Sequence, residues 1–120
     1  MSVGSEFIFE RRKHPRFYGA LPLDYRRADS PKIRTGHTLN ISEGGLMVLL
    51  SELMEAGERV EMKLYFNSPL GLVTVKTVMR AVWAEKKENE DGYFRIGMNH
   101  VSISPDNMAN LKLLLALHGG

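Results

Sequence analysis

The stretch RVEMKLYF, residues 59–66, decides the fold class because its apolar and polar residues alternate. Successive side chains of an extended strand point to opposite faces, so this alternation predicts a strand with one face in a core. A longer stretch, LVTVKTVMRAVWAEKK at residues 72–87, alternates in the same way after the turn NSPLG at 67–71. We therefore predict two antiparallel strands that are joined by a tight turn.

The longer stretch also predicts which of its residues lie in the core. One face consists of Val73, Val75, Thr77, Met79, Ala81 and Trp83. Trp83 continues the two-residue period of this face, so we predict that it is a core residue. The seven methionines of the chain are expected mainly to fill space in the core.

Four other segments predict strands that extend this pair into a barrel. They are LPLDYRR, HTLNI, LMVLL and YFRIGMNHV, at residues 21–27, 37–41, 46–50 and 93–101. Short strands joined mostly by tight turns favour an antiparallel sheet, and closing such a sheet removes its exposed edges. The predicted fold class is therefore mainly β: a small six-stranded antiparallel β-barrel with a C-terminal α-helix.

The C-terminal helix is predicted from the stretch SPDNMANLKLLLALHGG, residues 104–120. Ser104 is a suitable N-cap, Pro105 fits the first helical position, and Gly119 ends the apolar run. Apolar residues recur at spacings of three and four, so the helix is expected to pack on the mouth of the barrel or on a second subunit.

Length and composition point to one small globular domain. The chain has 120 residues, of which 43% are hydrophobic and 25% charged, and it contains no cysteine. The lack of cysteine excludes a disulfide framework, a thiol nucleophile and cysteine-ligated zinc. No apolar run approaches the roughly 20 residues that span a bilayer, so we expect no membrane insertion and a cytoplasmic protein. We divide the chain into a flexible N-terminal arm, residues 1–19, and a barrel domain with its helix, residues 20–118.

The sequence offers little basis for catalysis. Its four histidines lack the spacing of metal ligands, and neither a Gly-x-Ser-x-Gly motif nor a Walker-type loop occurs. We therefore expect a protein that is not an enzyme, with no catalytic residues, no metal site and no cofactor.

Positive charge gathers in the N-terminal part of the chain. Residues 1–35 contain eight basic and four acidic residues, whereas the remainder contains eight basic and ten acidic residues. Much of this excess lies in ERRKHPRF, residues 10–17, where Pro15 prevents a continuing helix. The arginines therefore lie on a loop or arm, where guanidinium groups can bind a phosphate or the edge of guanine. The alternative is a solvated basic tail before the first strand.

A second polar segment, NISEGG at residues 40–45, follows a predicted strand. Asn40 and Ser42 fall on the same side of the strand end because side chains alternate. The Ser42 hydroxyl can bond a phosphate oxygen, and the Asn40 amide can bond a base edge or hold an arginine. Gly44 and Gly45 allow positive φ and a close approach of the backbone to a ligand. The alternative is a turn in which Asn40 and Ser42 cap local backbone groups.

Together the two segments resemble the signature of PilZ domains, which are bacterial receptors for cyclic diguanylate (c-di-GMP). The signature is matched by Arg12-x-x-x-Arg16 and, after 23 intervening residues, by Asn40-x-Ser42-x-x-Gly45. Asn40 stands where aspartate is commoner in the family. The resemblance covers nearly the whole chain, from the basic arm through the barrel-like strands to the C-terminal helix.

The resemblance implies a binding site for c-di-GMP. Arg12 and Arg16 would engage guanine and phosphate, and Arg11, which matches an extra arginine of many members, would assist them. The second segment would lie on the barrel surface below the arm: Asn40 and Ser42 would bond guanine or orient the arginines, and Gly45 would keep the surface open. The arm is expected to be mobile without ligand and ordered with it, with a hinge at or near Gly19.

The resemblance also implies a function. We expect a stand-alone receptor that binds c-di-GMP, changes conformation and regulates a protein partner in motility, biofilm or secretion control. One alternative is a PilZ-like protein-interaction module that binds no nucleotide. Another is a basic barrel that binds nucleic acid, although we expect no nucleic-acid polymer as partner.

Overall fold

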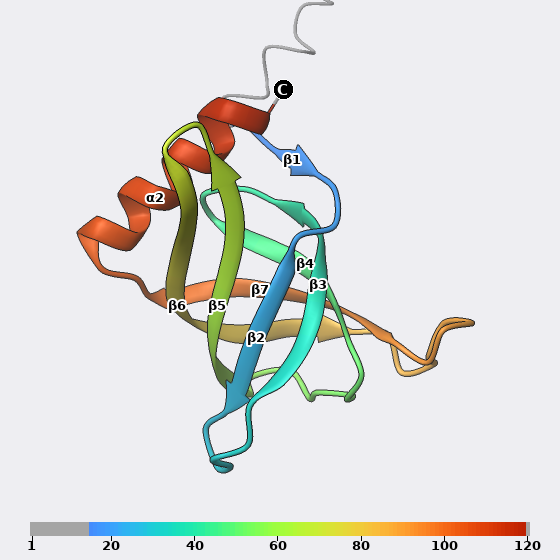
Figure 1. Cartoon of the computed structure of the whole chain (residues 1–120). Helices are drawn as coiled ribbons and strands as arrows, with labels where there is room; N and C mark the ends of the chain where they lie inside the picture. The colour runs from blue at the N-terminus through green and yellow to red at the C-terminus, as the bar shows by residue number, and fades with distance from the viewer. Residues whose placement is uncertain (1–14, 120) are drawn as a thin grey trace, which may run out of the picture.

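The computed structural model describes residues 15–119 of the chain, so Arg11, Arg12 and most of the predicted arm lie outside the described residues. The described part folds into strands followed by one helix (Figure 1). The elements are β1 (Phe17–Tyr18), β2 (Pro22–Arg27), β3 (Arg34–Ile41), β4 (Gly45–Leu50), β5 (Arg59–Ser68), β6 (Gly71–Ala84), β7 (Phe94–Ser102) and α2 (Pro105–His118).

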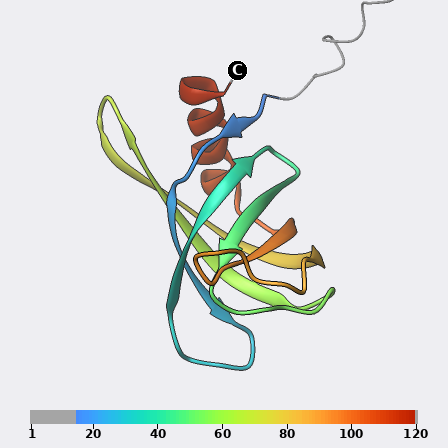
Figure 2. The same cartoon turned by 90° about the vertical axis from the view of Figure 1, so that its right-hand side faces the viewer.

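Six of the strands form a closed antiparallel barrel. Their order is β3-β2-β5-β6-β7-β4, and β4 pairs back with β3 to close the ring. Figure 2, which views the molecule from the side, shows the strands curling around a common interior. Every predicted strand is present, and the predicted fold class, a six-stranded antiparallel barrel with a C-terminal helix, is confirmed.

Alternation along β5 and β6 fills the barrel interior as the sequence predicts. Val60, Met62, Leu64 and Phe66 of β5 are all buried, and so are Val75, Met79 and Ala81 of β6. Burying one large aliphatic or aromatic side chain contributes about 1.5–3 kcal/mol to folding. The central hairpin therefore supplies much of the core that holds the barrel closed.

The helix α2 packs against β6 and β5 (Figure 1). Ser104 caps its first turn, because its side chain accepts a hydrogen bond from the backbone N–H of Asn107. The helix is fixed to β6 by Asn107 Oδ1, which accepts from the Lys76 backbone N–H at 2.7 Å, and by Asn110 Nδ2, which donates to the Thr74 carbonyl at 3.0 Å. No described helix is long and apolar enough to cross a membrane.

The last turn of α2 contacts the short strand β1. The ring of His118 meets the rings of Phe17 and Phe66 edge-on, with centroids 6.0 Å and 6.4 Å away. Strand β1 pairs with the end of β3, where Phe17 lies opposite Ile41. The end of the predicted arm therefore lies between β3 and the C-terminal turn of the helix.

Thr38 ties the segment after β1 to the barrel. Its side chain is fully buried, and its hydroxyl donates to the Gly19 carbonyl at 2.7 Å and accepts from the Leu21 N–H at 2.9 Å. The Gly19 N–H also donates to the Leu39 carbonyl at 3.0 Å. Gly19 is thus bonded to β3 through both of its backbone groups.

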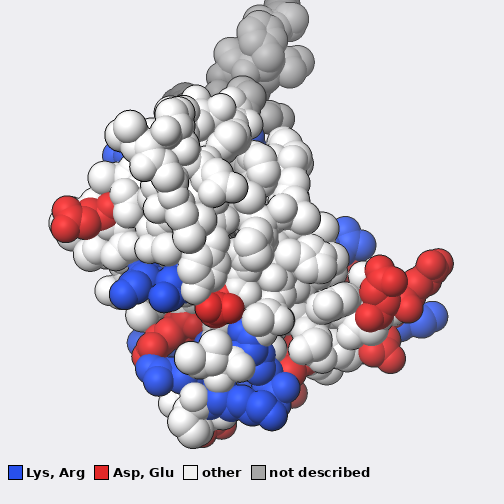
Figure 3. Space-filling view, viewed as in Figure 1, with Lys and Arg blue, Asp and Glu red and all other residues white. Residues whose placement is uncertain are grey.

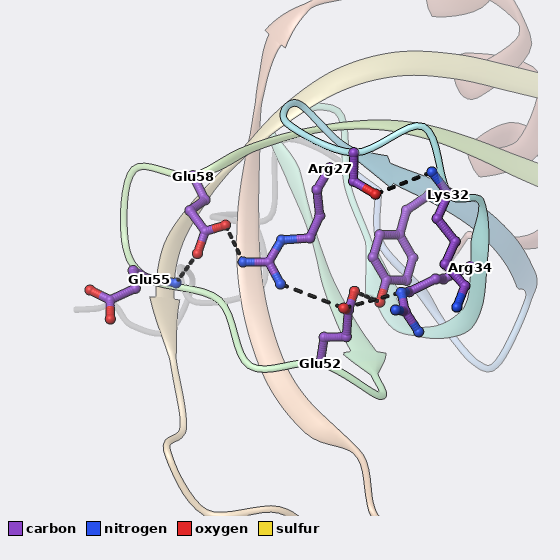
Figure 4. A network of polar contacts seen from close by, with 8 residues as sticks. Arg27, Lys32, Arg34, Glu52, Glu55 and Glu58 are labelled. Carbon is purple, nitrogen blue, oxygen red and sulfur yellow. Dashed lines mark hydrogen bonds and ion pairs between the residues drawn. The ribbon is translucent and has the colours of Figure 1, made fainter.

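A network of charges joins the β4–β5 loop to neighbouring strands (Figure 4). Arg27 forms an ion pair with Glu58 and lies 3.6 Å from Glu52, which also contacts Arg34 at 3.1 Å. The Tyr25 hydroxyl donates to Glu52 at 2.7 Å, and burial of this phenol, together with the carboxylate, raises the pKa of Tyr25. These contacts fix the loop to β2 and β3.

The predicted core position of Trp83 is wrong. In the pairing of β6 with β7, Ala81 lies opposite Met98 and Trp83 lies opposite Gly97. Two residues along β6 therefore correspond to one residue along β7, so Val82 is the extra residue of a β-bulge. The bulge turns Trp83 to the outer surface, where 40% of it is exposed.

Candidate functional site

The four described residues of the predicted binding site, Arg16, Asn40, Ser42 and Gly45, line one hollow on the outside of the barrel. This hollow has a volume of about 450 Å³ and lies where β3, β4, β7 and the end of β6 come together. Its lining residues are Arg16, Asn40, Ser42, Gly44, Gly45, Leu46, Met47, Val82, Trp83, Gly97, Met98 and Asn99. The fold thus brings Arg16 to the NISEGG segment, as the sequence predicts.

Ser42 shapes the turn between β3 and β4. Its backbone N–H donates to the Gly45 carbonyl at 2.9 Å, and its hydroxyl donates to the same oxygen at 3.3 Å. Ser42 therefore caps a local backbone group, as the alternative interpretation of the sequence predicted. A hydroxyl oxygen that donates its proton keeps its lone pairs, so Ser42 can still accept a hydrogen bond from a ligand.

Gly45 is required by the close approach of two strands. A Cβ atom at this position would lie 2.2 Å from the Met98 carbonyl oxygen and 2.9 Å from Asn99 Oδ1. Any side chain would therefore push β4 away from β7. A Cβ at Gly44 would meet nothing within 4 Å, and neither glycine uses the positive φ that glycine allows.

Asn40 presents its amide to the hollow. It is half-buried and lies opposite Met47 of β4 and Tyr18 of β1. Within residues 15–119, its side chain forms one hydrogen bond, a weak one of 3.9 Å from Nδ2 to the Met47 sulfur. The amide oxygen and much of the donor capacity of Asn40 are therefore available to a ligand or an arginine.

Arg16 supplies the positive charge of the hollow. It is exposed and directly precedes β1, in which Phe17 lies opposite Ile41. Continuing this register by one residue places Arg16 beside Ser42. No aspartate or glutamate is among the described residues that line the hollow, so its charge favours an anion.

Trp83 and Asn99 are lining residues that the binding motifs did not indicate. The indole of Trp83 lies against the backbone of Gly97, where a Cβ would come within 2.3 Å of the indole Nε1. A glycine inside a strand often marks a bulge or a close approach, so Gly97 was the signal that could have located Trp83. The lining of the hollow therefore includes both a flat aromatic ring and a guanidinium group.

The chemistry of this hollow suits recognition of a planar, anionic ligand. An arginine can pair with a phosphate or with guanine, an indole can stack on a base, and an amide and a hydroxyl can bond polar edges. Among the residues that the structure describes, no group of three or more His, Asp and Glu side chains is placed to hold a metal ion.

Comparisons with solved structures identify proteins of the same fold. The inhibitor of motility MotI/DgrA from Bacillus subtilis superposes with a TM-score of 0.71 and 14% identity; the match covers 89% of this chain and half, 50%, of that protein. The PilZ domain of YcgR from Escherichia coli, solved with c-di-GMP, gives a TM-score of 0.66 and 16% identity over 90% of this chain and 91% of that one. The MrkH–c-di-GMP complex from K. pneumonia gives 0.63 and 16% over 89% and 51%.

Sequence comparison assigns the family. Comparison with curated proteins found no match. The family model of the PilZ domain matches residues 10–117, which include the basic stretch 10–17, the whole barrel and nearly all of α2. This chain therefore belongs to the PilZ domain family.

Proposed function

We propose that this protein is a receptor for c-di-GMP, which binds in the hollow lined by Arg16, Asn40, Ser42 and Gly45. The observation that carries the proposal is that these residues, although 23 residues separate Arg16 from Asn40, line one hollow without a carboxylate among its described residues. Membership of the PilZ family supports it, and the solved domains of YcgR and MrkH that share the fold hold c-di-GMP.

The residues of the hollow have complementary roles in this proposal. The Arg16 guanidinium bonds a phosphate or the O6 and N7 atoms of guanine, and Arg11 and Arg12, which lie outside the described residues, add to it. Asn40 bonds a guanine edge or orients an arginine, and Ser42 accepts or shares a hydrogen bond at the turn.

The lining of the hollow adds two further roles to the proposal. The exposed face of the Trp83 indole stacks on one of the two bases. The absence of a side chain at Gly45 lets β4 lie close against β7, which holds together the strand ends that line the hollow.

Binding is proposed to order the arm over the hollow and thereby regulate a protein partner in motility, biofilm or secretion control. Ordering each backbone residue of an arm costs about 1–2 kcal/mol, so the overall affinity is expected to be modest, roughly micromolar. The functional unit in this proposal is an arm, residues 1–19, attached to a barrel domain with its helix, residues 20–118.

The test is calorimetry with c-di-GMP, c-di-AMP and duplex DNA. We expect c-di-GMP to bind more tightly than c-di-AMP, because adenine carries an N6 amino donor where guanine offers the O6 acceptor. Binding of c-di-GMP should weaken only modestly with salt, whereas DNA binding falls steeply as condensed counterions are released. Failure to bind c-di-GMP would favour the protein-interaction module, and tighter binding of DNA at physiological salt would favour the nucleic-acid barrel.

A further inference from the structure

The outer face of β5 and β6 sets like charges opposite one another. Arg59 lies directly opposite Arg80, and Lys63 lies directly opposite Lys76. We call these four residues the β5–β6 basic face. Like charges at directly opposed positions destabilise an antiparallel pair, so two such pairs in one hairpin work against the stability of the free protein.

No acidic residue lies directly opposite either member of the arginine pair. Beyond Arg59, the neighbouring backbone group on the β2 side is that of Ala28, and beyond Arg80 the partner on β7 is Asn99. Within residues 15–119, neither Arg59 nor Arg80 forms an ion pair.

The two carboxylates of this surface, Glu61 and Asp24, each have a bonding partner outside the β5–β6 basic face. Glu61, which lies between the two pairs on β5, forms an ion pair of 2.5 Å with Arg26 of β2. Asp24 of β2 lies directly opposite Lys63 and accepts a hydrogen bond of 2.5 Å from the Tyr65 hydroxyl, so the lysine pair is partly compensated, whereas the arginine pair is not. By contrast, Arg27 of β2 and Arg34 of β3 are both matched by glutamates of the β4–β5 loop (Figure 4). Within residues 15–119, arginines without an acidic partner are therefore not the rule; on this surface they are a feature of the β5–β6 basic face.

A shallow hollow of about 310 Å³ lies within this surface and includes Lys63 and Lys76. Ile33, from the loop between β2 and β3, also lines it and is 66% exposed. Figure 3 shows basic side chains gathered over the lower part of the sheet formed by β2, β5 and β6, with acidic ones between them. The surface thus combines excess positive charge with an exposed apolar side chain.

We propose that the β5–β6 basic face docks an acidic segment of a partner protein. Carboxylates placed over Arg59 and Arg80, and over Lys63 and Lys76, would turn the repulsion within each pair into attraction. The two pairs lie four residues apart on β5, so the matching carboxylates are about 13 Å apart.

A protein fits this face better than nucleic acid or an anionic membrane. Asp24 and Glu61 stand among the cations, and they would repel the continuous negative charge of a phosphate polymer or of a lipid surface. Ile33 and the hollow beside it can instead receive one apolar side chain of the partner, as the buried centre of a protein interface does.

The position of this face relates it to the nucleotide hollow. Gly45, Asn99, Arg80 and Arg59 form one transverse row across β4, β7, β6 and β5. Gly45 and Asn99 line the nucleotide hollow, and Arg80 is the next residue along the row. The inference rests on the proposed function only in one respect, because the docked segment would belong to the partner that the receptor regulates. Docking on this face itself requires no nucleotide.

The test is a titration of the isotopically labelled full chain, followed by NMR, without nucleotide. The probes are a glutamate-rich peptide with a central leucine, duplex DNA and phosphatidylglycerol vesicles, each at physiological salt. We expect the peptide to shift amide signals of residues 59–63 and 76–80. Arg80→Glu should weaken peptide binding roughly five- to tenfold, whereas the matched charge reversal Lys87→Glu, in the β6–β7 loop, should not.

A second measurement, the thermal unfolding midpoint, tests the repulsion between Arg59 and Arg80 without any peptide. Arg80→Glu places an acid opposite Arg59, so its thermal midpoint should rise above that of the unmodified chain. A lower midpoint would remove the argument from repulsion. Three results would overturn the proposal. DNA or vesicles could bind this face more tightly than the peptide, or the peptide could shift signals centred elsewhere. The third is an equal loss of peptide affinity in Arg80→Glu and Lys87→Glu. Any of these results would leave nucleotide binding in the other hollow untouched.

Discussion

The indole of Trp83 and the backbone of Gly97 lie in direct contact across the β6–β7 pair, so closely that a Cβ on Gly97 would stand 2.3 Å from the indole Nε1. The bulge at Val82 delivers the ring to the outer surface, and the glycine provides the flat backbone on which it rests. The position of the ring in the candidate nucleotide hollow therefore depends on a residue that has no side chain.

Substitution of Gly97 by alanine should displace this ring. Overpacking of this kind costs typically 1–3 kcal/mol, so the chemical denaturation midpoint should fall and c-di-GMP affinity should fall with it. The double variant Gly97→Ala with Trp83→Ala supplies the control, because the added methyl group then meets no indole. If Gly97→Ala destabilises both backgrounds equally, the contact is not the reason for the glycine.

Ligand binding should change the fluorescence of the protein, because Trp83 is the only tryptophan of the chain. A guanine stacked on the indole should quench its emission, and the quenching should saturate at the stoichiometry measured by calorimetry. Trp83→Ala should weaken c-di-GMP binding by about 1–3 kcal/mol, the usual contribution of an aromatic ring that stacks on a base. Trp83→Phe should retain part of it. Unchanged emission with full binding would place the bases away from this ring.

Loss of the Arg16 guanidinium should weaken c-di-GMP binding about ten- to a hundredfold. This range corresponds to charge-assisted hydrogen bonds of about 1.5–3 kcal/mol. Arg95→Ala is the matched control, because Arg95 is an exposed arginine of β7 that pairs with Glu85 at 3.3 Å and does not line the hollow. Ser42→Ala should cost less, around 1 kcal/mol. Equal effects of Arg16→Ala and Arg95→Ala would indicate general electrostatics instead of a contact.

Hydrogen exchange should locate the conformational response to c-di-GMP. We expect ligand to slow amide exchange in the arm, residues 8–19, and in residues 40–46, while residues 59–66 of β5 change little. Within the arm, residues up to 16 should respond most, because Gly19 is already bonded to β3 through its N–H and its carbonyl. Full protection of the arm before ligand is added would contradict the proposed ordering step.

Acidification should destabilise the protein through His100. Burial lowers the pKa of His100 below its usual 6.5, its Nδ1 lies 2.8 Å from the Thr77 hydroxyl, and its buried Nε2 has no hydrogen-bond partner among the described residues. A group with a depressed folded-state pKa contributes stability that is complete above its unfolded pKa and is lost as the pH falls through the folded pKa. The stability difference between the unmodified chain and His100→Gln should therefore shrink below about pH 6.5. If the difference in stability stays constant with pH, His100 is not the source of the acid destabilisation.

The alternation of residues was sufficient to predict the strands, because a barrel wall has one apolar face and a strand has a strict period of two. Val60, Met62, Leu64 and Phe66 follow this rule and are buried. Trp83 breaks it, because a bulge adds one residue without leaving a mark in the apolar pattern. The only indication in the sequence was Gly97, and its meaning depends on which strand lies beside it.

The candidate site was predictable to a similar extent. The motif residues Arg16, Asn40, Ser42 and Gly45 were identified from spacing and from family resemblance, and the fold gathers them around one hollow. The reason for Gly45 was not predictable, since it depends on how closely β4 approaches the Met98 carbonyl on β7. Pairings of this kind join residues far apart in sequence, and no local pattern records them.

The two-residue strand β1 lies between Arg16, which lines the candidate nucleotide hollow, and the end of α2. Arg16 lines the hollow, and the next residue, Phe17, faces His118 with ring centroids 6.0 Å apart. If nucleotide binding alters this contact, thermodynamic linkage makes the effect reciprocal. Suppose that a protein binds the last turn of α2 and raises the affinity for the nucleotide by some factor. The bound nucleotide must then raise the affinity for that protein by the same factor. Two residues of backbone can thereby convert the concentration of a small molecule into affinity for a macromolecule.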